Sequence, residues 1–197
     1  MQHIRTVAAI AAALFTSEIA SFGFGPGVAV AAPGQAICER EMAAAARAYK
    51  IPLGVLYAVG LTETGRRNSL SPYALNIEGE PKFPATARAA EAEVISAKAR
   101  GKKLIDIGCM QINHHFHGEK FRSVAHMLEP RANVRYAARF LNELHARQGT
   151  WTMAVARYHA GPNNDPAQKR YVCKVITNMV ASGFGQWTPE ASKFCKT

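Results

Sequence analysis

Glu63 is the acidic residue whose position is most informative about chemistry. Leu53, Leu56, Gly60 and Glu63 are spaced by three, four and three residues, so they share one face of a helix. Gly65 follows at the position where such a helix ends. The helix dipole disfavours a negative charge in the last turn, and partial desolvation raises the pKa of a carboxyl group there. A raised pKa is what a general acid needs near neutral pH.

The same position also suits a purely structural glutamate. A residue at a helix end can turn to solvent or pair with a neighbouring base, and Arg66 and Arg67 follow Glu63 closely. Acids with perturbed pKa values are a minority of the acids on buried faces. Position alone therefore favours the structural interpretation, and the surrounding residues must decide between the two.

Histidines and tryptophans suggest weaker sites. His114, His115 and His117 lie close together, but their spacing suits neither one face of a helix nor one face of a strand. We predict that they form a solvated or sugar-contacting loop, with no metal site and no cofactor. Trp151 and Trp187 have side chains that can stack on sugars, although Trp151, at a helix start, is more typical of a core residue.

Four short motifs follow one another along the chain. They are Glu-Thr-Gly at 63–65, Gly-Cys-Met-Gln-Ile at 108–112, Asn133 with the Tyr-Ala-Ala-Arg-Phe-Leu sequence after it, and Ala-Arg-Tyr-His-Ala-Gly at 156–161. The series resembles the catalytic domain of the soluble lytic transglycosylases, relatives of goose-type lysozyme, over residues 37–182. Their usual pattern is Glu-Ser-x-Gly, then Gly-Leu-Met-Gln-Ile, then Ala-x-x-Tyr-Asn-Ala-Gly. Each motif is weak by itself, but four in the same order are a strong joint signal.

The resemblance implies a lysozyme-like, mainly α (α+β) fold and assigns roles by match. Glu63 takes the place of the catalytic acid, Met110 and Gln111 correspond to residues that line the substrate groove, and Tyr158 corresponds to the tyrosine near the acid. The implied reaction is cleavage of the MurNAc–GlcNAc bond of peptidoglycan glycan strands, with formation of 1,6-anhydroMurNAc.

The sequence departs from the family's pattern at several places. Thr64 replaces serine but keeps a hydroxyl, and Cys109 replaces leucine, which is a conservative apolar change. His159 replaces asparagine, so a sugar contact by that side chain is not carried over. The segment 71–100 lengthens the stretch between the first two motifs. Its Ala-Leu-Asn-Ile-Glu-Gly sequence, with Gly-Cys-Met-Gln-Ile-Asn, resembles the branch associated with flagellar assembly or secretion systems, which implies components of such machines as partners.

The number of carboxylates bears on the mechanism. Hydrolytic glycosidases generally need two, but no matched motif supplies a partner for Glu63, and Glu78, Glu80 and Asp106 are candidates only by proximity in sequence. Lytic transglycosylases need no second carboxylate, so the resemblance implies that the C6 hydroxyl of the same sugar attacks C1, an intramolecular step favoured by proximity. Glu63 would act as general acid and then as base. The alternatives are a hydrolytic muramidase and a non-catalytic peptidoglycan-binding assembly protein of an envelope-spanning machine.

The elements that must position these residues are mostly helical. We expect a hairpin at 73–83 with a Glu-Gly turn, an extended segment at 104–112, and helices over 37–49, 52–64, 85–100, from an Asn133 cap to Gly149, 151–158, and from Asp165-Pro166 to Gly183. These form one lysozyme-like catalytic domain, 37–182, followed by a C-terminal tail, 183–197, that Cys195 ties down.

The four cysteines indicate disulfides and no metal. None lies in a CxxC pair, so the spacing does not favour a zinc site or a thioredoxin-type motif. One or two disulfides are expected in an oxidising compartment. Cys109 lies in an apolar segment and suits a buried free thiol, while three full pairings of Cys38, Cys109, Cys173 and Cys195 remain open.

The N-terminus predicts export. Basic residues precede an apolar run at 7–15, and the small residues 29–32 fit a signal-peptidase site, so we interpret 1–31 as a signal peptide and expect the mature protein in the periplasm. Removing this segment leaves the net charge at +10. The bases are scattered and no nucleic-acid recognition pattern accompanies them, so we expect an acidic wall polymer as partner rather than nucleic acid, and a monomer.

Overall fold

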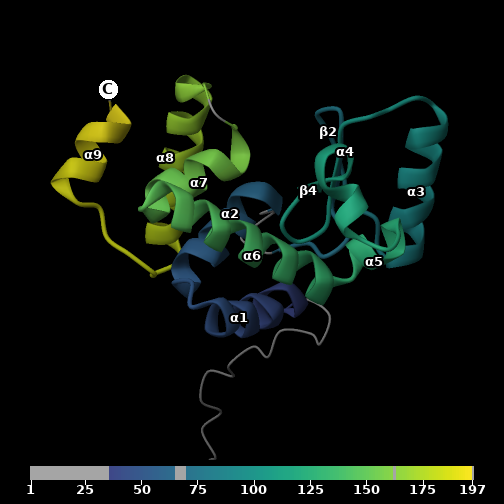
Figure 1. Ribbon diagram of the computed structural model, residues 1–197, viewed down its shortest axis with the longest axis horizontal. Helices are drawn as coiled ribbons and strands as arrows, with labels where there is room; N and C mark the ends of the chain where they lie inside the picture. The colour runs from purple at the N-terminus through teal and green to yellow at the C-terminus, as the bar shows by residue number, and fades with distance from the viewer. Residues whose placement is uncertain (1–35, 65–69, 162, 197) are drawn as a thin grey trace, which may run out of the picture. The chain divides into compact units, whose positions relative to one another are not determined.

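The computed structural model describes residues 36–64, 70–161 and 163–196. Its helices are α1 (Ile37–Tyr49), α2 (Leu53–Thr64), α3 (Ala87–Ala99), α4 (His114–His117), α5 (Val124–Leu128), α6 (Pro130–Gln148), α7 (Trp151–His159), α8 (Asp165–Ala181) and α9 (Pro189–Lys196), with a 3₁₀ turn η1 (Gly118–Lys120) (Figure 1). The predicted mainly helical architecture is confirmed. None of these described helices is long and apolar enough to cross a membrane. The predicted signal peptide, 1–31, and the predicted helix end at Gly65 lie outside the described residues.

Helix α2 lies among the other helices because it is apolar on almost every side. It packs against α1 and α8, while α6 packs on α1 and α7, and α7 packs in turn on α8. Pro52 precedes the helix, and its carbonyl accepts hydrogen bonds from the amides of Val55 (3.0 Å) and Leu56 (3.3 Å). The proline therefore starts the helix as predicted, and α2 carries Glu63 in its last turn.

The predicted hairpin forms one edge of a small antiparallel sheet. Strands β1 (Leu75–Ile77), β2 (Glu80–Lys82), β3 (Ile105–Ile107) and β4 (Ile112–Asn113) are ordered β2-β1-β3-β4. Glu78 and Gly79 join β1 to β2 with φ values of 50° and 95°, the pair of positive angles that a type I′ turn requires. The segment predicted as extended, 104–112, supplies β3 and the start of β4. A turn at 108–111 therefore lies between the two strands.

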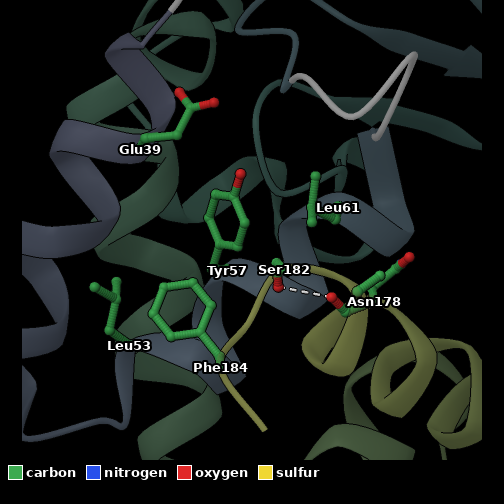
Figure 2. A pocket seen from close by; sticks show the side chains of 8 residues that line it. Glu39, Leu53, Tyr57, Leu61, Asn178, Ser182 and Phe184 are labelled. Atoms are coloured by element: carbon green, nitrogen blue, oxygen red, sulfur yellow. Dashed lines mark hydrogen bonds between the residues drawn. The ribbon is translucent and has the colours of Figure 1, made fainter. Parts of the chain in front are cut away.

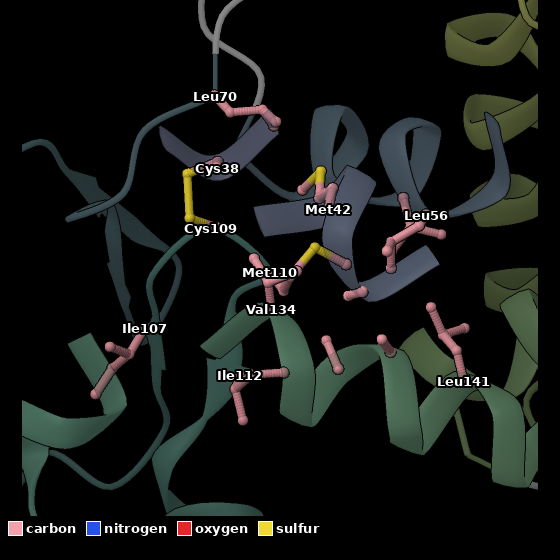
Figure 3. Close-up of a cluster of buried hydrophobic side chains, with 14 of the residues drawn as sticks. Cys38, Met42, Leu56, Leu70, Ile107, Cys109, Met110, Ile112, Val134 and Leu141 are labelled. Carbon is pink, nitrogen blue, oxygen red and sulfur yellow. A yellow bond between two sulfur atoms is a disulfide. The ribbon is translucent and has the colours of Figure 1, made fainter. Parts of the chain in front are cut away.

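The main core lies where α1, α2 and α6 meet the turn between β3 and β4. Met42, Leu56, Met110 and Leu141 are fully buried there (Figure 3). A disulfide joins Cys38 of α1 to Cys109 of the turn, with Cα atoms 5.8 Å apart. The interpretation of Cys109 as a free thiol was therefore wrong, because its partner lies 71 residues away in the sequence and the apolar segment around Cys109 does not reveal it.

Asn133 does not cap α6, contrary to the prediction. The helix begins at Pro130, because a proline is well suited to the first turn, so Asn133 lies inside the helix. Its fully buried side chain donates to the carbonyls of Ile107 (2.8 Å) and Met127 (3.1 Å) and accepts from the amide of Met110 (2.9 Å). Asn133 thus holds the β3–β4 turn by hydrogen bonds instead of capping the start of a helix.

The C-terminal segment is structured, and its cysteine is bonded. A second disulfide joins Cys173 of α8 to Cys195 of α9. Phe184 packs its ring on Tyr57 of α2, with centroids 5.5 Å apart (Figure 2), and a Cβ on Gly54 would lie 2.7 Å from the Phe184 Cβ. The predicted tie through Cys195 is confirmed, but the segment also forms a helix and has an anchor of its own.

Candidate active site

Glu63 is held at the end of α2 by residues from α7 and α8. The Tyr171 hydroxyl of α8 donates a hydrogen bond of 2.5 Å to Glu63 Oε1. The His159 ring stacks flat on the Tyr171 ring, with centroids 4.2 Å apart, and places Nδ1 4.0 Å from the same oxygen. Only 15% of the Glu63 side chain is exposed. The prediction that the helix face partly buries this carboxyl group is confirmed.

The groups around Glu63 shift its pKa in opposite directions. Burial raises its pKa from 4.5 to about 7, and the Asp106 charge adds to the rise, whereas the Tyr171 hydrogen bond and the Lys174 ammonium lower it. Burial and Lys174 also lower the pKa of His159, so its ring is neutral at pH 7 and its contact with Glu63 is not an ion pair. Burial raises the pKa of Tyr171 well above its ordinary value, so its hydroxyl keeps the proton that it donates.

Glu63 lies in the wall of an open cavity of about 590 Å³. Residues of helices α2, α4, α6 and α7, of strands β1, β3 and β4 and of two loops line it: Glu63, Asn76, Asp106, Gln111, Ile112, Asn113, Phe116, His117, Phe140, Arg157, Tyr158, His159 and Gly161. The lining includes aromatic rings, amides and carboxyl groups, and Phe116 is 64% exposed. This mixture suits a sugar, which has apolar C–H faces and a rim of hydroxyl groups.

The other predicted site residues occupy different places around this cavity. Tyr158 lines it and donates a hydrogen bond of 2.8 Å to the Met110 carbonyl. Gln111 also lines it, and its Nε2 donates to the carbonyls of Ala74 (3.0 Å) and Gly108 (3.1 Å), which fixes the side chain in a residue with a φ of 45°. The Met110 side chain is fully buried in the core, so the expectation that it lines the groove is corrected: only its carbonyl takes part, by holding Tyr158.

One candidate for a second carboxylate is in the cavity and two are outside it. Asp106 lines the cavity and accepts a 2.7 Å hydrogen bond from Asn113 Nδ2, while burial raises its pKa. Glu78 pairs with Lys102 at 2.8 Å, and Glu80 is exposed on β2. Neither of these two lines the cavity, so Asp106 is the partner that a hydrolytic mechanism would need.

The three neighbouring histidines lie in the short helix α4, which Asn113 caps, so the prediction of a loop was wrong. Their side chains make separate contacts. His117 lines the cavity and shares a 2.8 Å hydrogen bond with the Tyr136 hydroxyl, and His114 Nε2 lies 3.3 Å from Lys98 Nζ. His115 meets the edge of a neighbouring ring. Across the residues that the structure describes, no three His, Cys, Asp or Glu side chains gather as a metal site requires.

Tyr171 is the functional residue that sequence reasoning missed. It lies 108 residues after Glu63, so no local pattern joins the two. A signal was available, because Gln168, Tyr171 and Val175 are spaced by three and four residues on one face of α8, and all three are buried. A tyrosine on such a face needs a partner for its hydroxyl, and here the partner is the acid.

The sequence of the chain matches one known protein family. The sequence model of the Transglycosylase SLT domain family matches residues 41–179, so the chain belongs to this family of lysozyme-like lytic transglycosylases. Peptidoglycan is therefore the class of polymer on which its domain acts. No match was found among curated proteins or among solved structures.

Proposed function

We propose that the protein is a periplasmic lytic transglycosylase that cleaves the MurNAc–GlcNAc bond and leaves a 1,6-anhydroMurNAc end, with Glu63 as acid and then base. One observation carries the proposal: the Glu63 side chain is only 15% exposed in the cavity wall and accepts a hydrogen bond from Tyr171, and its burial raises its pKa from 4.5 to about 7. A group that gives up a proton in one step and takes one back in the next works best when neither form is strongly preferred.

The first step of the proposed reaction needs the protonated form of Glu63. The Glu63 carboxyl donates its proton to the glycosidic oxygen, the C1–O bond breaks, and the leaving sugar departs with a free C4 hydroxyl. The positive charge that develops at C1 is stabilised by the acetamido group of the same sugar. Glu63 is now a carboxylate, and the Tyr171 hydrogen bond at 2.5 Å stabilises the charge that burial disfavours.

The second step of the proposed reaction needs the carboxylate form of Glu63. The C6 oxygen of the same sugar forms a bond to C1, and Glu63 accepts the proton from that hydroxyl. Because the nucleophile belongs to the substrate, no second carboxylate and no water are needed. The neutral His159 fits this scheme, since a cation at 4.0 Å would hold Glu63 in its ionised form and prevent the first step.

A hydrolytic muramidase is the second candidate, and Asp106 favours it. This carboxyl group lines the same cavity as Glu63 and is close enough to raise the pKa of Glu63. An ionised Asp106 could activate a water that attacks C1. The Asn113 side chain donates to one Asp106 oxygen, however, and this hydrogen bond already gives the carboxyl group a structural role.

The cellular setting is also part of the proposal. Two disulfides support an oxidising compartment, which agrees with a signal peptide at 1–31 and a periplasmic protein. We propose that the monomer opens the wall for an envelope-spanning machine such as a flagellum or a secretion system. The non-catalytic alternative, a wall-binding assembly protein, would make Glu63 dispensable.

Digestion of purified sacculi by the mature protein tests the proposal. We expect soluble 1,6-anhydromuropeptides from the wild type and none from Glu63→Gln, which keeps the shape of the side chain but cannot donate a carboxyl proton. Glu93→Gln, at an exposed glutamate of α3, is the matched control and should retain full activity. Equal release by wild type and Glu63→Gln, or reducing ends in place of anhydro ends, would contradict it.

A further inference from the structure

A second cavity meets the first at Glu63. It has a volume of about 400 Å³ and is lined by Thr62, Glu63, His159, Ala167, Arg170, Tyr171 and Lys174. Its outer wall is therefore the cationic face of α8. A third cavity, of about 590 Å³, continues across that face toward α9 and shares Arg170 and Lys174 with the second. Shared lining residues therefore link the cavity beside Glu63 to the surface of α8.

Two cations dominate this face, and no carboxylate of the described residues is within ion-pair distance of them. Arg170 and Lys174 are four residues apart on α8, so they lie on one side of the helix, and both are exposed. The salt bridges of the described part of the chain involve neither residue. Lys174 is close enough to Glu63 to influence its pKa. Unpaired cations beside an active site favour an anionic part of the substrate.

The C-terminal segment completes this face with an aromatic side chain. Trp187 is 43% exposed and lines the third cavity together with Lys196. The segment is held at two places, by Phe184 on α2 (Figure 2) and by the Cys173–Cys195 disulfide to α8. An eight-residue helix such as α9 is not stable by itself in water, so these anchors keep it beside α8 (Figure 1).

We propose that Arg170, Lys174, Lys196 and Trp187, here called the α8–α9 surface, bind the peptide that the glycan substrate carries. This inference rests on the proposed function. In peptidoglycan the peptide branches from the muramic acid residue, whose C1 bond Glu63 would break, so the branch must leave the groove close to Glu63. Its carboxylates match the two unpaired cations, and its aliphatic parts match the Trp187 ring. The segment that supplies Trp187 lies outside the family match at 41–179.

The position of the cations favours a peptide over an anionic lipid surface. Arg170 and Lys174 line the same cavity as Glu63, so a ligand that reaches them lies close to the bond being cleaved. A peptide attached to the cleaved sugar meets this condition. A surface that docks on a membrane would gain nothing from this arrangement. Lipid binding is therefore the competing outcome that the experiment must detect.

The test compares two substrates and two matched variants. Product release is measured from glycan strands that carry peptides and from strands stripped of peptides by an amidase. For the double variant Arg170→Ala, Trp187→Ala we expect KM for the peptide-bearing strands to rise about tenfold, the effect of losing one charge-assisted hydrogen bond. KM for stripped strands should stay unchanged. Arg88→Ala, at an exposed arginine of α3, is the control and should behave as wild type on both.

Three results would overturn the inference. An equal loss on both substrates means that the surface contacts the glycan, and no loss on either means that it does not bind substrate. Binding of wild type to vesicles of phosphatidylglycerol that the double variant loses, with unchanged KM, means that it binds lipid.

A binding measurement separates this inference from the proposed function. In the Glu63→Gln background, which is used so that no substrate is consumed, soluble peptide-bearing strands should bind about tenfold more tightly than stripped strands. Arg170→Ala with Trp187→Ala should remove that difference. If the wild type releases no product but this difference is present, the proposed activity fails and the peptide site stands. Equal affinity for the two kinds of strand overturns the peptide site whatever the activity.

Discussion

Replacing Glu63 by glutamine should change how stability depends on pH. The folded protein raises the pKa of Glu63 from 4.5 to about 7. Between these two values the unfolded chain has lost the proton that the folded protein still holds, so the free energy of unfolding falls as pH rises through this window. Above about pH 7 both states are ionised and the loss is complete. Glutamine does not titrate, so the variant escapes this loss.

The size of the effect follows from the shift itself. A difference of one pKa unit corresponds to about 1.4 kcal/mol, so the rise from 4.5 to about 7 corresponds to about 3 kcal/mol. With 15% of its side chain exposed, Glu63 is buried enough that solvent screens little of this energy. We expect Glu63→Gln to gain about 3 kcal/mol relative to wild type between about pH 4 and about pH 8.

Urea unfolding of the two proteins across this pH range measures the gain. The difference between them isolates Glu63, because every other titrating group is common to both and cancels. Glu93→Gln controls for the loss of one acidic side chain from an exposed position. A difference that does not vary with pH would refute the buried, perturbed acid. If the free energy of unfolding of Glu63→Gln instead falls relative to that of wild type as pH rises, the folded protein favours ionised Glu63, as in the structural interpretation.

Three other changes test the site and its supports. Tyr171→Phe removes a hydrogen bond that lowers the pKa of Glu63, so the alkaline limb of the pH–rate profile should move to higher pH; a limb that stays in place argues against this contact. Asn133→Leu removes three hydrogen bonds to buried backbone groups and should cost about 3 kcal/mol in urea unfolding. The double variant Cys38→Ala, Cys109→Ala should lower the free energy of unfolding by about 4 kcal/mol, as expected for a disulfide that closes a long loop, and an unchanged urea midpoint would contradict the bond.

Local features of the fold could be predicted because their causes lie within a few residues. The Glu78-Gly79 turn requires two positive φ angles and sets the register of its own hairpin, and the sequence contains both residues side by side. Helix α1 has the predicted bounds of 37–49. Asn133 shows the limit of this reasoning, because a good capping residue and Pro130 compete for the same helix start, and the contacts that decide between them come from Ile107 and Met127.

The candidate site was predicted in part for the same reason. Glu63 could be placed on a partly buried face from helical spacing, and Tyr158 and Gln111 could be placed by motif. Tyr171 and the cavity over α8 depend on how α2 and α8 pack, and no short-range pattern encodes that contact. The disulfide pairs were undetermined for a similar reason, since four cysteines fit three pairings until the helices are placed.

Product analysis in isotopically labelled water tests the central claim most directly. Sacculi are digested by the wild type in water enriched in heavy oxygen, and the released muropeptides are weighed by mass spectrometry. If the C6 hydroxyl closes on C1 after Glu63 protonates the bond, the muramic ends are one water lighter than reducing ends and carry no label. Labelled reducing ends would contradict the account, because they require a water activated by a second group, and Asp106 would then be that group.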